Sequence, residues 1–159
     1  MPAETMEGGC SCRSVRYRMT APPLITHCCH CRWCQRETGS AFVINALVET
    51  SNLQVTGETL AIDTPSQSGR GQKILRCPKC HVALWSHYSG GGPALAFVRV
   101  GTLDNPDVFQ PDVHIYVQSK QPWVRLPEGA KAFDEFYNVP EVWSPQARAR
   151  AKAAKEALA

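Results

Sequence analysis

Several features of well-known protein classes are missing from this sequence. No uncharged apolar run approaches the roughly 20 residues that a membrane-spanning helix needs, so we expect no membrane partner. Residues 1–9 carry neither the basic start nor the apolar run of a signal peptide, which predicts a cytoplasmic protein with reduced thiols. Internal repeats and low-complexity linkers are also missing. A chain of 159 residues with 43% hydrophobic content therefore fits one main domain that buries its own core.

Long helical patterns are scarce as well, and most of the chain consists of short apolar segments separated by glycine, proline, serine and asparagine. Such segments, rich in β-branched and aromatic residues, are typical of strands and predict a mainly β fold. The expected strands lie at residues 15–18, 42–48, 53–56, 60–63, 72–76, 94–100 and 113–117. Because a Thr-Gly-Glu turn joins the third and fourth of these segments, we expect them to form a hairpin.

Two short helical segments complete the expected fold. Residues 32–39 are predicted to form a helical turn that ends at a glycine. Near the C-terminus, Ser144 suits the N-cap of a helix, Pro145 suits its first position, and alanine-rich sequence follows. We therefore divide the chain into a main domain at residues 1–140 and a helical tail at residues 141–159. The tail either packs on its own domain, which its marginal length favours, or acts as a basic arm that docks elsewhere.

Cysteine is abundant, and its spacing carries most of the functional information. Seven of the eight cysteines form three short clusters, Cys10-Ser11-Cys12, Cys29-His30-Cys31-Arg32-Trp33-Cys34 and Cys77-Pro78-Lys79-Cys80. A disulfide framework rarely places three cysteines within six residues, whereas zinc sites are built from closely spaced cysteines. A closed tetrahedral site uses four protein ligands, and an open site uses three. Seven cysteines therefore predict two Zn²⁺ per chain, one closed and one open.

The first and third clusters fit the closed, structural site. Cys10 and Cys12 are two residues apart, so in extended backbone their side chains project from the same face and can bind one ion. Cys77 and Cys80 form the other common half-site, a tight turn in which Pro78 fixes φ and removes one N–H. One Zn²⁺ bound by these four thiolates would join the start of the domain to its middle.

The middle cluster, with Cys29, Cys31 and Cys34, offers three thiolates to the second Zn²⁺ and leaves its fourth position open for catalysis. Cys28 is expected to point to the opposite face of the backbone. A fourth ligand from Cys28 or from a nearby histidine is the main alternative, because it would close the site. A redox-active pair of Cys31 and Cys34 is a weaker alternative, since a third thiolate lies two residues before it.

Two further observations bear on the choice between an enzyme and a binding module. The glycine-rich run at residues 89–92 has no lysine at P-loop spacing, so no nucleotide site is expected there. The formal charge is only +3, and seven thiolates with two Zn²⁺ would lower it to zero, which disfavours binding to nucleic acid. A non-catalytic zinc module that binds a protein or nucleic acid is the alternative to an enzyme with an open zinc site.

The same residues resemble the family of glutathione-dependent formaldehyde-activating enzymes and the related centromere protein V group. The matching segments are Gly8-Gly9-Cys10-Ser11-Cys12 with Val15-Arg16-Tyr17, the run from Cys29 to Phe42, Cys77-Pro78-Lys79-Cys80, Gly101-Thr102-Leu103-Asp104, His114-Ile115-Tyr116-Val117 and Trp123. The likeness runs from about Glu7 to Tyr137, and the tail lies outside it. The family usually has glycine where this chain has Arg13 and His81, which predicts strained turns beside an intact set of zinc ligands.

The resemblance implies an all-β, tent-like fold that is stabilised by zinc. It assigns the first and third clusters to the structural ion through Cys10, Cys12, Cys77 and Cys80. It assigns the middle cluster to the catalytic ion through Cys29, Cys31 and Cys34.

The activity that the resemblance implies is that of a carbon–sulfur lyase, which interconverts glutathione and formaldehyde with S-(hydroxymethyl)glutathione. A small thiol such as glutathione and an aldehyde are then the expected partners, with the thiol bound and deprotonated at the open zinc site. His27, Thr38 and Ser40 are the candidate proton donors, because they are near the middle cluster in the sequence. The sequence leaves open which thiol and aldehyde are used and whether the chain forms a homo-oligomer.

Overall fold

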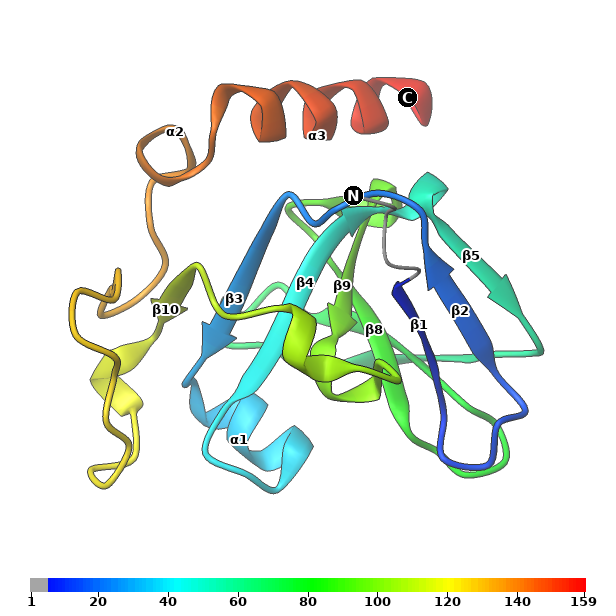
Figure 1. Ribbon diagram of the computed structural model, residues 1–159, viewed down its shortest axis with the longest axis horizontal. Helices are drawn as coiled ribbons and strands as arrows, with labels where there is room; N and C mark the ends of the chain where they lie inside the picture. The colour runs from blue at the N-terminus through cyan, green and yellow to red at the C-terminus, as the bar shows by residue number, and fades with distance from the viewer. Residues whose placement is uncertain (1–5) are drawn as a thin grey trace.

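The structure of the protein, a computed structural model, describes residues 6–159 and arranges their strands in two sheets (Figure 1). The smaller sheet contains β1 (Met6–Gly9), β2 (Arg16–Met19) and β5 (Leu53–Thr56), in the order β1-β2-β5. The larger sheet contains β3 (Ile25–Cys29), β4 (Val43–Glu49), β6 (Leu60–Thr64), β7 (Gln72–Arg76), β8 (Ala83–Tyr88), β9 (Leu95–Arg99) and β10 (Val113–Ile115). Its order is β10-β3-β4-β9-β8-β7-β6, and the β10–β3 pair is parallel. The expected mainly β fold is confirmed.

Helices occupy a smaller part of the chain. They are α1 (Arg32–Thr38), α2 (Val139–Val142) and α3 (Pro145–Ala157), with 3-10 turns η1 (Thr50–Asn52), η2 (Gly92–Ala94), η3 (Val100–Thr102), η4 (Pro106–Val108) and η5 (Val117–Ser119). Within residues 6–159, no helix combines the length and the apolar character needed to cross a membrane.

The larger sheet has a hydrophobic core on each face, because successive buried side chains of a strand point to opposite faces. On β4, Ala46 and Val48 belong to one core and Leu47 belongs to the other. The first core also contains side chains of β2 and includes cysteines of the first and third clusters. The second core contains the middle cysteine cluster and is covered by α3, whose Ala147 and Ala151 are buried. The two groups of cysteines therefore lie in different cores.

The expected hairpin between residues 53–56 and 60–63 is wrong. Both segments are strands, but β5 pairs with β2 in the smaller sheet and β6 pairs with β7 in the larger one. Gly57 between them has a φ of 92°, and a Cβ atom there would lie 2.1 Å from the carbonyl oxygen of Ser14. The glycine therefore allows the chain to pass close to the backbone before β2 as it leaves the smaller sheet.

The local signals for helix ends predicted α1 and α3 correctly. Gly39 ends α1 in the left-handed conformation with a φ of 65°. Ser144 caps α3, because its hydroxyl oxygen accepts a 3.0 Å hydrogen bond from the N–H of Ala147, and Pro145 takes the first helical position. In Figure 1, α3 lies across one end of β4 and β9. The tail therefore packs on the main domain.

A salt bridge joins α3 to β4, and its removal should destabilise the protein. Arg150 donates two hydrogen bonds of 2.7 Å to the carboxylate of Glu49, which is buried, and one of 2.9 Å to the carbonyl oxygen of Pro22. Burial alone would raise the pKa of Glu49, but the hydrogen bonds and charge of Arg150, together with hydrogen bonds from the Glu49 backbone and from Asn52, outweigh it and hold that pKa below its ordinary value. Arg150→Ala would leave the carboxylate buried without its cation. We expect the free energy of unfolding at neutral pH to fall by about 2 kcal/mol.

Urea denaturation of the zinc-loaded protein measures this loss. Arg148→Ala is the matched control, because Arg148 is exposed on the same helix, and we expect a change within about 0.5 kcal/mol. The contribution of the salt bridge is present above the unfolded-state pKa of Glu49 and is lost as the pH falls through its lower folded-state pKa. The difference in the free energy of unfolding between Arg150→Ala and the wild type should therefore disappear at acidic pH. Equal stability of the two arginine variants at neutral pH would contradict the prediction.

Candidate metal centres and active site

The four cysteines of the first and third clusters come together between two turns, one after β1 and one after β7: Cys10, Cys12, Cys77 and Cys80. All four Sγ atoms lie within 4.8 Å of one another, and that of Cys12 is 3.5 Å from Cys10 and 3.6 Å from Cys77. Thiolates around a tetrahedral Zn²⁺ are roughly 3.8 Å apart. The Ser14 hydroxyl, 3.2 Å from the Sγ of Cys77, helps to lower the pKa of Cys77 to about 5, which favours the thiolate. This donor set fits a closed zinc site.

The turns that carry these cysteines contain two residues in the left-handed region. Arg13 has a φ of 65° and His81 has a φ of 63°, at the positions where the family resemblance predicts glycine. This conformation costs a non-glycine residue about 1–2 kcal/mol, whereas glycine costs roughly 0.5–1 kcal/mol in unfolded-chain entropy. We expect Arg13→Gly and His81→Gly each to raise the free energy of unfolding, by up to about 1 kcal/mol.

Thermal unfolding of the zinc-loaded variants measures this gain. Arg125→Gly is a suitable control, because Arg125 is an exposed loop residue outside the left-handed region. There the added glycine increases only the entropy of the unfolded chain, so we expect a small loss of stability. A loss of similar size in Arg13→Gly would show that Arg13 is not strained.

The cysteines of the middle cluster lie at the end of β3 and the start of α1, with all three Sγ atoms within 4.8 Å of one another and buried. Cys31 caps α1, because its sulfur accepts a 3.3 Å hydrogen bond from the N–H of Cys34. Hydrogen bonds from the thiols of Cys29 and Cys34 lower the pKa of Cys31 to about 3, and the interaction with Cys31 raises the pKa of Cys29 well above its ordinary value. Without a metal ion, the three thiols therefore favour a single thiolate, at Cys31. A divalent cation would favour all three thiolates, so the donor set fits an open zinc site.

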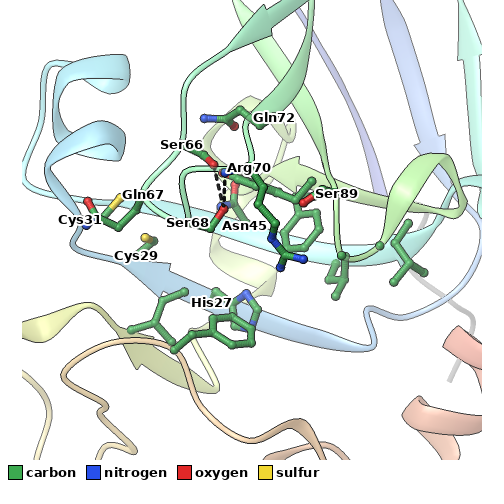
Figure 2. A pocket seen from close by; sticks show the side chains of 18 of the residues that line it. His27, Cys29, Cys31, Asn45, Ser66, Gln67, Ser68, Arg70, Gln72 and Ser89 are labelled. Carbon is green, nitrogen blue, oxygen red and sulfur yellow. Dashed lines mark hydrogen bonds between the residues drawn. The ribbon is translucent and has the colours of Figure 1, made fainter.

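A cavity of about 330 Å³ opens at the middle cluster (Figure 2). The three cysteines line one end of it, and its wall is largely apolar, with contributions from Leu47, Leu95, Phe97, Ile115 and Trp143. Two exposed cationic side chains, Arg70 and Lys155, also line the cavity. Figure 2 shows Arg70 reaching from the loop between β6 and β7 toward His27. An apolar wall with a few polar groups is typical of sites for small molecules.

His27 lies in this cavity, on the same face of β3 as Cys29 two residues later. Its Nε2 is 2.5 Å from the hydroxyl oxygen of Tyr137, which accepts a 2.7 Å hydrogen bond from Nε1 of Trp143. In the tautomer in which Tyr137 donates its hydroxyl hydrogen to Nε2, the ring proton of His27 lies on Nδ1. Burial lowers the pKa of His27 to about 4, so the imidazole is neutral at pH 7. In that tautomer, the neutral His27 offers Nδ1–H as a hydrogen-bond donor.

The other residues considered near the middle cluster lie outside the cavity. Thr38 donates a 2.9 Å hydrogen bond to the carbonyl oxygen of Cys34, and Ser40 is exposed. Cys28 and His30 lie together with His114 in a separate buried group. Cys28 therefore lies apart from the three-cysteine group, as its position next to Cys29 in extended backbone predicts.

Several cavity residues escaped the sequence analysis, because they are far from the cysteines along the chain. They are Arg70, Tyr116 and Lys155, and Tyr137, which contacts the cavity residue His27, was missed for the same reason. Tyr116 adopts a left-handed conformation with a φ of 55° directly after β10, which is unusual for a bulky residue and is often found at functional sites. Tyr116 belongs to a segment that resembles the family, but no local spacing connects it with Cys29. Arg70 and Lys155 had no signal beyond their charge.

Comparisons with known proteins identify the family of the chain and a solved structure with a similar fold. A family model described as glutathione-dependent formaldehyde-activating enzyme matches residues 5–119. A protein of Halomonas elongata, provisionally named a glutathione-dependent formaldehyde-activating enzyme, is 27% identical over 128 residues, which cover 76% of this chain and 80% of that protein. A crystal structure of a Rhodobacter sphaeroides protein shares the fold, with a TM-score of 0.50, 22% identity, and coverage of 67% of this chain and 97% of that one.

Proposed function

Because the chain belongs to the family of glutathione-dependent formaldehyde-activating enzymes, we propose that it is a carbon–sulfur lyase for thiol–aldehyde adducts. The expected adduct is of the S-(hydroxymethyl)glutathione type. The observation that carries this proposal is the position of the middle cluster, where three buried thiols line one end of a largely apolar cavity. Binding modules normally use closed zinc sites, so an open cluster in a cavity favours turnover.

Two Zn²⁺ per chain are part of the proposal. Four cysteines would hold the structural ion: Cys10, Cys12, Cys77 and Cys80. Cys29, Cys31 and Cys34 would hold the catalytic ion, which when bound supplies a Lewis acid that lowers the pKa of a substrate thiol. Thiolate sites of this kind require reducing conditions, which favours a cytoplasmic location.

The reaction itself requires a proton transfer and one new bond. In the direction of synthesis, the S–H bond of the thiol breaks, a carbon–sulfur bond forms to the aldehyde carbon, and the carbonyl oxygen gains a proton. Cleavage is the reverse, and nothing is oxidised or reduced. His27 is the residue of this chain that would stabilise the carbonyl oxygen of the aldehyde. Its neutral Nδ1–H can donate a hydrogen bond to this oxygen as negative charge develops on it. The apolar wall of the cavity strengthens such a hydrogen bond by excluding water.

The two cationic side chains of the cavity suit a thiol that carries carboxylates, as glutathione does at both of its ends. Arg70 comes from the loop between β6 and β7, and Lys155 comes from α3. A guanidinium binds a carboxylate through two parallel hydrogen bonds, and an ammonium group binds it as a point charge. We infer that Arg70 and Lys155 bind the thiol outside its reacting sulfur.

Cobalt substitution tests the proposal. Co²⁺ takes the place of Zn²⁺ in thiolate sites, and its visible absorption depends on its ligands. Titration of the cobalt protein with glutathione is expected to change the absorption of one metal centre and to leave the rest of the spectrum unchanged. In a parallel assay, the zinc-loaded protein should exchange S-(hydroxymethyl)glutathione with its components faster than the uncatalysed reaction does.

An unchanged cobalt spectrum together with a rate equal to the uncatalysed rate would contradict the proposal. A salt-dependent affinity for DNA or RNA would then support the alternative, a zinc-stabilised binding module.

A further inference from the structure

The face of β3 that points away from the cavity carries a second group of metal-ligand side chains. Side chains alternate along extended backbone, so Cys28 of β3 and His30, the residue after its end, lie on the side opposite to Cys29. β10 pairs with β3 in parallel, and its register places His114 directly beside Cys28. Strand register thus brings together a thiol and two imidazoles that are far apart in the sequence. All three side chains are buried, with exposed fractions of 1% for Cys28, 0% for His30 and 8% for His114.

The donor atoms of this group are spaced as the ligands of one metal ion would be. Nε2 of His30 is 3.5 Å from the Sγ of Cys28 and 3.0 Å from Nδ1 of His114. All three donor atoms lie within 4.8 Å of one another. With zinc–nitrogen bonds of about 2.0–2.1 Å and zinc–sulfur bonds of about 2.3 Å, tetrahedral ligands are roughly 3.3–3.6 Å apart. The observed contacts to His30 are close to these values.

Hydrogen bonding alone accounts poorly for this arrangement. A ring nitrogen of neutral histidine carries either one hydrogen or one lone pair. Nε2 of His30 therefore makes one good hydrogen bond, yet both Cys28 and His114 approach it. The other ring nitrogen, Nδ1, has no hydrogen-bond partner among residues 6–159, although it is buried. The polar contacts of the His30 ring are thus concentrated at a single point, where one ion would bind all three groups.

We propose that Cys28, His30 and His114 form a third metal site, which binds Zn²⁺ independently of the two cysteine sites. Cysteine thiolate and neutral imidazole are both ordinary zinc ligands, and three protein ligands are enough for a site that keeps one open position. The fourth position is left to water or another small ligand. The bound ion joins β10 to β3, and the last residue of β10, Ile115, lines the cavity together with Tyr116 directly after it. The site therefore stabilises one wall of the cavity from the opposite face of β3.

Metal stoichiometry tests this proposal on the full-length protein. The wild type is incubated with excess Zn²⁺ under reducing conditions, freed of unbound metal by gel filtration, and analysed for zinc per chain by mass spectrometry. We expect three Zn²⁺ in the wild type and two in both Cys28→Ser and His114→Gln. Two Zn²⁺ in the wild type, or three in the folded variants, would overturn the proposal.

A spectroscopic measurement separates the third site from the middle cluster. When the spectrum of cobalt-loaded His114→Gln is subtracted from that of the cobalt-loaded wild type, the remaining absorption should be that of one tetrahedral centre with a single thiolate ligand. His87→Gln is the matched control, because His87 is only partly buried and its Nδ1 contacts the carbonyl oxygen of Leu95, far along the chain from β3. It should retain all three ions. Should His114→Gln fail to fold, Cys28→Ser still decides, because it should hold one ion fewer than the wild type, and an unchanged zinc content in this variant would exclude the third site.

Discussion

Cys31→Ser is expected to abolish adduct turnover while leaving a folded protein that has lost the zinc of the middle cluster. Cys31 is one of only three cysteines in this group, and it lies at the start of α1. Its loss should leave two thiolates, too few to hold the ion that polarises the substrate. Because such an ion contributes several kcal/mol to the reaction, the rate should fall by on the order of 10²–10³-fold.

Serine is the informative replacement at this position because it preserves the local structure. The Sγ of Cys31 accepts a hydrogen bond from the N–H of Cys34 as the N-cap of α1, and a serine hydroxyl makes the same bond. Thermal stability should therefore change far less than activity. Ser40→Ala is the control, since Ser40 is exposed and lies outside the cavity. Full activity in Cys31→Ser would exclude the open-site mechanism.

Cys77→Ser should have the largest effect on stability. Cys77 is completely buried in the first core and belongs to the group that joins the turn after β1 to the turn after β7. Structural zinc contributes an apparent binding free energy of about 10–16 kcal/mol, which is similar to the roughly 5–15 kcal/mol that stabilises a whole domain. Weakening this site should therefore leave the chain largely unfolded. Circular dichroism and zinc analysis of the purified variant would measure both consequences.

The control for this substitution is Ser11→Ala. Ser11 lies between Cys10 and Cys12 but is exposed, so its loss should change neither the zinc content nor the melting temperature appreciably. A strong chelator should unfold the wild type in the same way as the Cys77→Ser substitution does. A Cys77→Ser protein with native circular dichroism and a native melting temperature would show that the four-cysteine group does not hold the fold together.

Most strands could be predicted from the sequence, but their partners could not. The segments at residues 53–56 and 72–76 coincide with β5 and β7, because β-branched and aromatic composition is a local property. β3 was missed, since all five of its side chains are buried and its sequence shows no polar–apolar alternation. The hairpin expected between β5 and β6 was wrong, because the close contact of Gly57 with Ser14 depends on the packing of two sheets.

The candidate site, too, could be predicted from the sequence only in part. Spacing within the sequence grouped the cysteines, and the structure places the predicted members of each group together. The sequence also separated Cys28 from Cys29, because neighbouring side chains in extended backbone point in opposite directions. It offered no reason to connect His27 with Tyr137, since 110 residues separate them in the chain.

The sequence by itself therefore determined the grouping of the cysteines into four and three and the family to which the chain belongs. These follow from residues a few positions apart, whose relative geometry is set by the local backbone. Only the tertiary structure decided what surrounds the groups. It placed Arg70 and Lys155 at one cavity, and it placed His114 beside Cys28. Such contacts depend on strand register and on the packing of distant segments, and a single sequence carries no local signal for either.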